Sequence, residues 1–334
     1  MRKFKYIIFL LLITTLSACG KEFTFKRHNE FVGYENKEII LYQDTKDNAV
    51  KFFEYEKFDF ISYDDQTETV VLTSNDKLFV HNYKNGKKLY EIDLGRDDIS
   101  SLETYKGKAA ICFNSQEEGL IRLINLSKGE TQDYPSNLQT SQAFLDDKYM
   151  YVAEGGDQYG EVYKMDLSSG EISLFVNKRF YRGHIDINRR ESLIYVSEGG
   201  NSGELFYLNV EDSTIREINY SSHYKPIFFD GQHLHNSGNL YHSSSGRYVS
   251  GDEIYEKIEN DKFKYVRTLL SNNLLTIIEG DKNNTFIYSK ENNYLVYGFK
   301  ANVNKAIEIS KTKYLLACDD RKHVAIVDIS KIKK

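Results

Sequence analysis

One segment of this chain repeats at a distance of 44 residues. Residues 149–156 read YMYVAEGG, and residues 193–200 read LIYVSEGG. Each copy is followed by Gly-Glu, by an alternating strand-like run (residues 160–167 and 203–210) and by a turn. Self-similarity at a period of about 20 to 50 residues is typical of repeat architectures, so this feature constrains the fold more than any single motif does.

The same strand-like run recurs along most of the chain. It begins near Leu78, Leu120, Val162, Leu205, Tyr248, Phe286 and Val324, at spacings of 42, 42, 43, 43, 38 and 38 residues. Short apolar runs alternate with Asn, Asp, Gly and Ser, and the chain holds 46 Tyr and Phe residues but only two Pro. This pattern predicts an all-β fold.

Seven units of about forty residues, each with about four short strands, match the blades of a β-propeller. Over residues 50–330 the chain resembles the WD40-like and YVTN-like propellers, although it has no Trp and so lacks the Trp-Asp signature. We expect a single propeller of seven blades. Six and eight blades also fit, because residues 39–43 form a further strand candidate and residues 225–260 are the least regular unit.

The last unit contains only three strand-like runs, at residues 305–309, 314–318 and 323–329. Residues 49–55 (AVKFFEY) precede the first full unit and have the length of a strand. We therefore expect this N-terminal strand to close the last blade, which would remove an exposed sheet edge.

The first eighteen residues have the layout of a secretory signal. Arg2, Lys3 and Lys5 precede an apolar run that is too short for a comfortable membrane crossing. The sequence Leu-Ser-Ala-Cys ending at Cys19 resembles the lipobox of bacterial lipoproteins. That resemblance implies cleavage before Cys19 and attachment of acyl chains such as palmitate to this residue; the alternative is an ordinary signal peptide with an incidental cysteine.

The expected organisation is a signal peptide over residues 1–18, a lipidated cysteine and polar tether over residues 19–37, and a propeller over residues 38–334. The mature protein would be anchored to the outer membrane of a Gram-negative cell or to the outer face of a Gram-positive cell membrane. Without the leader, 41 basic and 49 acidic residues remain, a net charge of −8. This balance gives no electrostatic case for nucleic-acid binding.

Two further cysteines, Cys112 and Cys318, lie in apolar strand patterns. Exported proteins often contain disulfides. The repeat places these two cysteines on equivalent strands two blades apart, which is too far for a disulfide. We predict two buried free thiols.

Established catalytic motifs are missing. The sequence has no Gly-x-Ser-x-Gly elbow, phosphate loop, His-Glu-x-x-His helix or EF-hand loop. His233 and His235 share one face of a predicted strand and are candidate zinc or copper ligands, although surface histidines in an irregular blade explain them equally. No cofactor is implied.

Two interpretations concern the turns between the second and third strands of each unit. The first is an acidic rim that attracts a basic partner, although Asp is also an ordinary turn residue. Its candidates are Asp76, Glu118, Glu154, Asp157, Glu198, Asp252, Asp281 and Asp320. The second is acid–base chemistry, as a lyase or hydrolase on a sugar or lactone, at Arg182, His184, Glu198 and His223.

The sequence favours binding over catalysis. The leading hypothesis is a membrane-anchored, monomeric propeller that binds an envelope protein, a peptide or a glycan through its acidic loop face. The resemblance to propeller lipoproteins is architectural and transfers no binding residue.

Overall fold

The computed structural model describes part of the chain, between residues 50 and 331. The described ranges are 50–114, 119–136, 140–154, 159–181, 184–188, 193–197, 205–218, 228–229, 233–236, 239–242, 248–251, 266–271, 274–279, 284–289, 294–299, 303–310, 312–318 and 320–331. Within these ranges no helix is long and apolar enough to cross a membrane.

The described strands form seven antiparallel sheets of four strands each, which we number from 1 to 7. Sheet 1 contains β2 (Phe60–Asp64), β3 (Thr69–Ser74), β4 (Lys77–Asn82) and β5 (Lys88–Asp93). Sheet 2 contains β6 (Ile99–Tyr105), β7 (Lys108–Phe113), β8 (Gly119–Asn125) and β9 (Thr131–Ser136). Sheet 3 contains β10 (Thr140–Leu145), β11 (Tyr149–Glu154), β13 (Val162–Asp166) and β14 (Ile172–Leu174).

The other four sheets follow in chain order. Sheet 4 contains β16 (His184–Asn188), β17 (Leu193–Ser197), β18 (Leu205–Asn209) and β19 (Ile215–Ile218). Sheet 5 contains β20 (Phe228–Phe229), β21 (His233–Asn236), β22 (Asn239–His242) and β23 (Tyr248–Gly251). Sheet 6 contains β24 (Val266–Ser271), β25 (Leu274–Glu279), β26 (Asn284–Ser289) and β27 (Tyr294–Phe299). Sheet 7 contains β28 (Val303–Ser310), β29 (Lys313–Cys318), β30 (His323–Asp328) and β1 (Val50–Glu54), and the short 3-10 helix η3 (Ile329–Lys331) follows β30.

The repeat in the sequence is carried by the turn between the third and fourth strands. An Asn or Asp that ends the third strand accepts a hydrogen bond from the backbone N–H two residues later, at 2.9 Å for Asn82 and 2.8 Å for Asp166. Four residues after each of these, Gly86 and Gly170 adopt a positive φ of 70° and 74°. Side-chain capping by Asn or Asp and a left-handed glycine are the standard chemistry of tight turns.

Burial changes from the second strand of a sheet to the fourth. β3 is buried along almost its whole length, whereas β5 is mostly exposed. A strand that is covered on both faces reads as a continuous apolar run, which is what the sequence of β3 (TVVLTS) shows. The core therefore lies between neighbouring sheets. One cluster packs β3 and β4 against β7, and an equivalent cluster packs β11 and β13 against β17 and β18.

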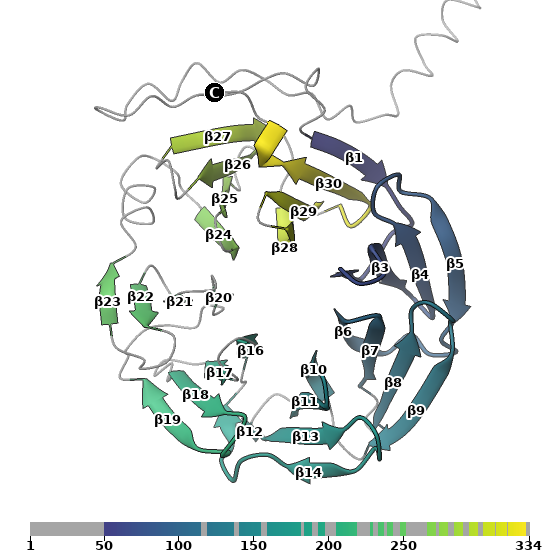
Figure 1. Ribbon diagram of the computed structural model, residues 1–334, viewed down its shortest axis with the longest axis vertical. Helices are drawn as coiled ribbons and strands as arrows, with labels where there is room; N and C mark the ends of the chain where they lie inside the picture. The colour runs from purple at the N-terminus through teal and green to yellow at the C-terminus, as the bar shows by residue number, and fades with distance from the viewer. Residues whose placement is uncertain are drawn as a thin grey trace, which may run out of the picture.

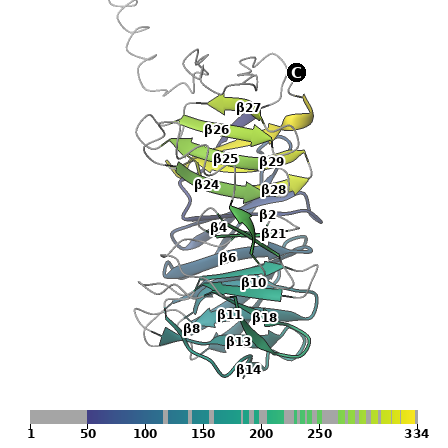
Figure 2. The same ribbon diagram turned by 90° about the vertical axis from the view of Figure 1, so that its left-hand side faces the viewer.

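The sheets are arranged around a common axis, with the first strand of each innermost and the fourth outermost (Figure 1). β2 contacts β6, β6 contacts β10, and the contacts continue through β16, β20 and β24 to β28, which contacts β2. The side view shows that the strands run across the thickness of the molecule, roughly along the common axis (Figure 2). This is the arrangement of a β-propeller, so the predicted all-β propeller fold is confirmed.

The N-terminal strand of the described chain belongs to the last sheet. β1 pairs antiparallel with β30, from Val50 opposite Val327 to Glu54 opposite His323. Its Phe53 ring lies against Gly86, in the β4–β5 turn of sheet 1. The segment after β1 continues this contact, because the Tyr55 N–H donates to the Lys322 carbonyl at 2.9 Å. Residues 39–43, the other strand candidate near the N-terminus, lie outside the described chain.

The register proposed for the fifth unit is wrong. We expected the recurring third strand to begin near Tyr248, but Tyr248 begins β23, the fourth strand of sheet 5. The third strand is β22, which contains only Asn239–His242. A four-residue strand with one apolar and one aromatic residue lacks the alternating signature that marks the third strand elsewhere.

The two downstream cysteines occupy equivalent places. Cys112 lies on β7 and Cys318 on β29, the second strands of sheets 2 and 7. Both are buried and neither forms a disulfide, so the prediction of two buried cysteines with no disulfide between them is confirmed.

Candidate functional site

The propeller has two faces, which we name after residues on them. The Asp76 face carries the turns between second and third strands, such as the β3–β4 turn with Asp76. The Asp65 face carries the turns between first and second strands, such as the β2–β3 turn with Asp65. Each innermost strand runs from the Asp76 face to the Asp65 face. In sheet 1, for example, Phe60 pairs with Thr73 and Asp64 pairs with Thr69.

Three candidates for the acidic rim are described, and all lie on the Asp76 face. Asp76 has an exposed side chain, and its backbone carbonyl accepts a hydrogen bond from the Leu94 N–H at 2.6 Å. The Asp320 carboxylate accepts from the His323 N–H of its own turn at 2.9 Å. The Glu154 carboxylate accepts from the Glu161 N–H at 3.3 Å. Two of these three carboxylates therefore stabilise their own connections.

Cations accompany the carboxylates on this face. The Arg321 guanidinium lies 3.4 Å from the Asp59 carboxylate. This ion pair joins the β29–β30 turn of sheet 7 to the start of sheet 1. The Arg96 Nε donates to Asp98 at 2.9 Å beside the start of β6. The described part of the Asp76 face is thus of mixed charge, with Asp76 as an exposed carboxylate within it.

A two-stranded ribbon is built on the long β11–β13 connection of sheet 3. β12 (Tyr159–Gly160) pairs with β15 (Phe180–Tyr181), which lies on the chain between sheets 3 and 4. Arg179 lies 3.8 Å from Glu161 beside the ribbon. Burial, followed by the hydrogen bond to Glu161, raises the pKa of Tyr163 to about 12, so its hydroxyl remains a donor at neutral pH.

The other candidates on this face lie wholly or partly outside the described chain. The acidic ones are Glu118, Asp157, Glu198, Asp252 and Asp281. Of the residues assigned to acid–base chemistry, Arg182, Glu198 and His223 lie outside, and only the backbone of His184 is described, at the start of β16. His233 and His235 lie on one strand, β21, as expected. Their side chains are not among the described parts of the structure.

One expectation about the acidic rim is wrong. We expected every unit to carry a carboxylate between its second and third strands. In sheet 5 those strands are β21 and β22, and the two residues between them are Ser237 and Gly238. Asp252, the candidate assigned to that turn, instead follows the fourth strand β23.

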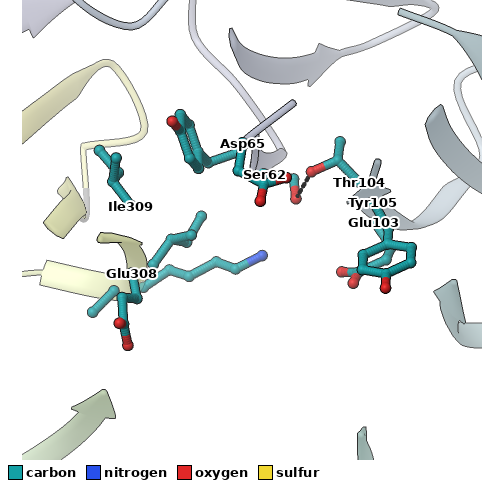
Figure 3. Close-up of a pocket in the computed structure, with 11 residues that line it drawn as sticks. Ser62, Asp65, Glu103, Thr104, Tyr105, Glu308 and Ile309 are labelled. Carbon is teal, nitrogen blue, oxygen red and sulfur yellow. Dashed lines mark hydrogen bonds between the residues drawn. The ribbon is translucent and has the colours of Figure 1, made fainter. Parts of the chain in front are cut away.

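A cavity of about 490 Å³ lies beside the propeller axis, at the ends of three innermost strands next to the Asp65 face. We call it the Lys305 cavity. It is lined by Ser62, Tyr63, Asp65, Glu103, Thr104, Tyr105, Lys305, Ala306, Ile307, Glu308 and Ile309, which come from β2 and its turn, β6 and β28 (Figure 3).

Lys305 reaches the wall of the cavity from β28. Its Nζ donates to the backbone carbonyl of Ile61 on β2 at 2.8 Å. The residue is exposed to solvent, although many protein atoms lie around its ammonium group beside the propeller axis. This desolvation lowers the pKa of Lys305 below its ordinary value of 10.5, and attraction to the Glu103 carboxylate partly offsets the effect.

Cross-sheet hydrogen bonds fix the opposite wall. Ser62 Oγ and Thr104 Oγ1 share a hydrogen bond of 2.8 Å between β2 and β6 (Figure 3). Asp64, only 1% exposed, accepts from the Gly107 N–H of the β6–β7 turn at 2.8 Å and from the Thr67 N–H of its own turn at 2.8 Å. Sheets 1 and 2 are thus held in register around the cavity, and the wall is preformed.

β28 is irregular where it lines the cavity. Its pairing with β29 shifts between Val303 and Lys305 and again between Glu308 and Ser310. Such bulges redirect side chains and are common beside functional sites. Sequence reasoning missed this site, because residues 62–65, 103–105 and 305–309 come from distant units and show no shared motif.

Within the described residues, no group of three or more His, Cys, Asp or Glu side chains lies close enough to hold a metal ion. The carboxylates of the Lys305 cavity are therefore too dispersed to form a metal centre together. Glu103 and Glu308 lie on opposite sides of the cavity (Figure 3).

Comparisons with known proteins show the class of fold. The sequence matches no protein-family model and no curated protein. The structure is similar to the β-propeller domain of Cps50 (Swd1) from Myceliophteria thermophila, with a TM-score of 0.59 and 9% identity, over 84% of this chain and 99% of that one. It is also similar to the computationally designed protein Ika8, with a TM-score of 0.51 and 8% identity, over 82% of this chain and 98% of that one. At such low identity the likeness shows the fold alone, which is a β-propeller.

Proposed function

We propose that this chain is a lipid-anchored, seven-bladed β-propeller that works without catalysis as a binding module in the cell envelope. Its Asp76 face would dock a partner protein that presents basic side chains. Cys19 would carry the lipid, on the outer membrane of a Gram-negative cell or the outer face of a Gram-positive cell membrane.

The observation that carries the proposal is the bracing of the Asp76 face. The Arg321–Asp59 pair ties the β29–β30 turn of sheet 7 to the start of sheet 1, and the contacts of Asp320 and Glu154 each stabilise the connection in which they lie. A surface that is already ordered loses little conformational entropy when it binds, which favours recognition. Asp76 adds an exposed negative charge that a basic partner can meet.

The seven blades and their closure support a rigid platform. Seven four-stranded sheets with a continuous series of contacts between innermost strands are the basis for the proposed blade number. The pairing of β1 with β30 is the basis for closure by the N-terminal strand. Because β1 is the outermost strand of its sheet, the chain from Cys19 would join the ring at its circumference (Figure 1).

The anchor is tested by metabolic labelling. Cells that express the full chain and its Cys19→Ala variant receive an alkyne analogue of palmitate. We expect label on the wild-type chain and none on the variant. Equal labelling of both chains, or of neither, contradicts the assignment of Cys19.

The binding face is tested by cross-linking on intact cells, followed by purification of the full chain. The key variant is Asp76→Lys, and the matched control is Glu130→Lys, which reverses an exposed carboxylate in the β8–β9 turn on the Asp65 face. A partner recovered with the wild type and the control, but lost with Asp76→Lys, supports the proposal. A partner lost equally from both variants, or retained by both, argues against this face.

A further inference from the structure

We propose that the Lys305 cavity binds a small organic cation, through an ammonium or guanidinium group on a short alkyl chain. The site lies at the Asp65 face, at the other end of the propeller from the proposed partner surface. It therefore stands independently of the proposed partner.

The cavity has the size and order of a ligand site. Its volume of about 490 Å³ lies in the range of about 300 to 1,000 Å³ that is usual for small-molecule pockets. Its walls come from three strands, and the Ser62–Thr104 bond and the Lys305–Ile61 bond tie these strands together across sheet boundaries. It reaches the surface at Asp65, whose side chain is exposed.

The charge of the lining selects the sign of the ligand. The described side chains around the cavity carry three carboxylates, Asp65, Glu103 and Glu308, against the single ammonium of Lys305. Lys305 is fixed to the wall by its bond to Ile61 and interacts with Glu103. A second cation inside the cavity meets an excess of negative charge, whereas an anion that approaches Lys305 is repelled by the carboxylates around it.

The remaining lining selects the kind of cation. Ala306, Ile307 and Ile309 supply an apolar wall along β28, and Tyr63 supplies an aromatic ring on β2. An alkyl chain can bury its methylenes on such a wall while its charged end meets a carboxylate, as lysine side chains do on protein surfaces. A bare metal ion gains nothing from these apolar groups, and the described carboxylates are not gathered closely enough to ligate one.

Lys305 makes the proposal unusually testable, because its charge opposes the ligand. If the cavity selects cations, the Lys305→Met variant, which keeps the length and the apolar stem of the side chain, removes repulsion and binds the ligand more tightly. If the cavity instead selects anions, the same variant loses binding. A purely structural role for Lys305 predicts neither change.

The experiment is calorimetric titration of the full chain, purified in detergent at low ionic strength, with spermidine as the probe. We expect Glu103→Gln and Glu308→Gln each to weaken binding about tenfold, and Lys305→Met to strengthen it several-fold. Glu130→Gln, which removes an exposed carboxylate in the β8–β9 turn outside the cavity lining, serves as the control for non-specific attraction and should leave the affinity unchanged. Circular dichroism confirms that each variant is folded, and Asp65→Asn replaces Glu103→Gln if that variant does not fold.

Two further titrations complete the test. A capped Gly-Arg-Gly peptide separates the two sources of such a cation. Tighter binding of the peptide indicates a basic side chain of a polypeptide, and tighter binding of spermidine indicates a free amine; either supports a cation site. Malonate is the opposite probe. Three results overturn the proposal: malonate binding that is lost in Lys305→Met, equal weakening of spermidine binding by Glu130→Gln and Glu103→Gln, or no binding of either cation.

Discussion

Gly86 offers the sharpest test of the seam between the first and last sheets. It lies in the β4–β5 turn with a φ of 70°, and the Phe53 ring of β1 covers it. A Cβ added at Gly86 would overlap that ring, with the Phe53 Cε1 atom only 3.0 Å away. Gly95 has a nearly equal φ of 65°, but a Cβ there meets nothing within 4 Å. The two glycines thus differ in their neighbours and hardly in backbone conformation.

The expected magnitudes follow from this difference. Alanine in the left-handed region costs roughly 1 to 2 kcal/mol, which both Gly86→Ala and Gly95→Ala should show. Gly86→Ala also displaces the half-buried Phe53 ring, and losing part of the burial of a phenylalanine side chain costs about 1 to 2 kcal/mol more. We therefore expect Gly86→Ala to be about twice as destabilising as Gly95→Ala.

The assay is denaturant unfolding followed by circular dichroism and tyrosine fluorescence, since the chain has 26 Tyr and no Trp. A double-mutant cycle isolates the clash. In a Phe53→Ala background, Gly86→Ala should cost no more than Gly95→Ala, which gives a coupling energy of about 1 to 2 kcal/mol. If Gly86→Ala has the same cost in both backgrounds, Phe53 does not cover this turn, and the placement of β1 against sheet 1 is wrong.

Three further predictions concern buried groups. Asp64→Asn should cost about 2 to 3 kcal/mol in the same assay, because the new amide points a donor at the Gly107 N–H; a cost near zero would mean that the link between sheets 1 and 2 is absent. Burial lowers the pKa of His81 below its ordinary value of 6.5, so its neutral ring stabilises the fold above that pH and this contribution is lost as the pH falls towards the folded-state pKa. The free energy of unfolding should therefore decline on acidification below pH 6.5 less steeply in His81→Gln, and identical pH profiles would refute this role. A thiol reagent should label neither Cys112 nor Cys318 in the native chain and both after denaturation; labelling of the native thiols would contradict their burial.

The fold could be predicted because its repeat lies in local chemistry. The capped turn with a left-handed residue four positions later recurs at Asn82, Asn125, Asp166 and Asn209, and each instance is readable from the sequence. The register was predicted wrongly where this turn chemistry is weaker. β22 has only four residues, and the strand that begins at Tyr248, which is the fourth strand of sheet 5, was mistaken for it.

The Lys305 cavity could not be predicted in the same way. Its walls meet only because β28 lies beside β2, although Lys305 and Ile61 are 244 residues apart. Two pairing shifts in β28 also change which side chains face the axis. The sequence of this strand has no Gly or Pro from which these shifts could have been predicted. The acidic rim shows the opposite case. Its carboxylates were visible in the sequence, but the arginines that neutralise part of the face became apparent only in three dimensions.

The pairing of β1 with β30 has a consequence for how this protein is made. Val50 and Val327 are partners although almost the whole domain is synthesised between them. If the chain is exported from its N-terminus, as the proposed function requires, β1 crosses the membrane before the other strands of the propeller. Its edge then stays unpaired until the last strand follows. Contacts of such long range form slowly, and a waiting strand is open to wrong pairing. We expect the nascent chain to need an envelope chaperone that protects β1. We expect truncation at the C-terminus to leave β1 without its partner strand.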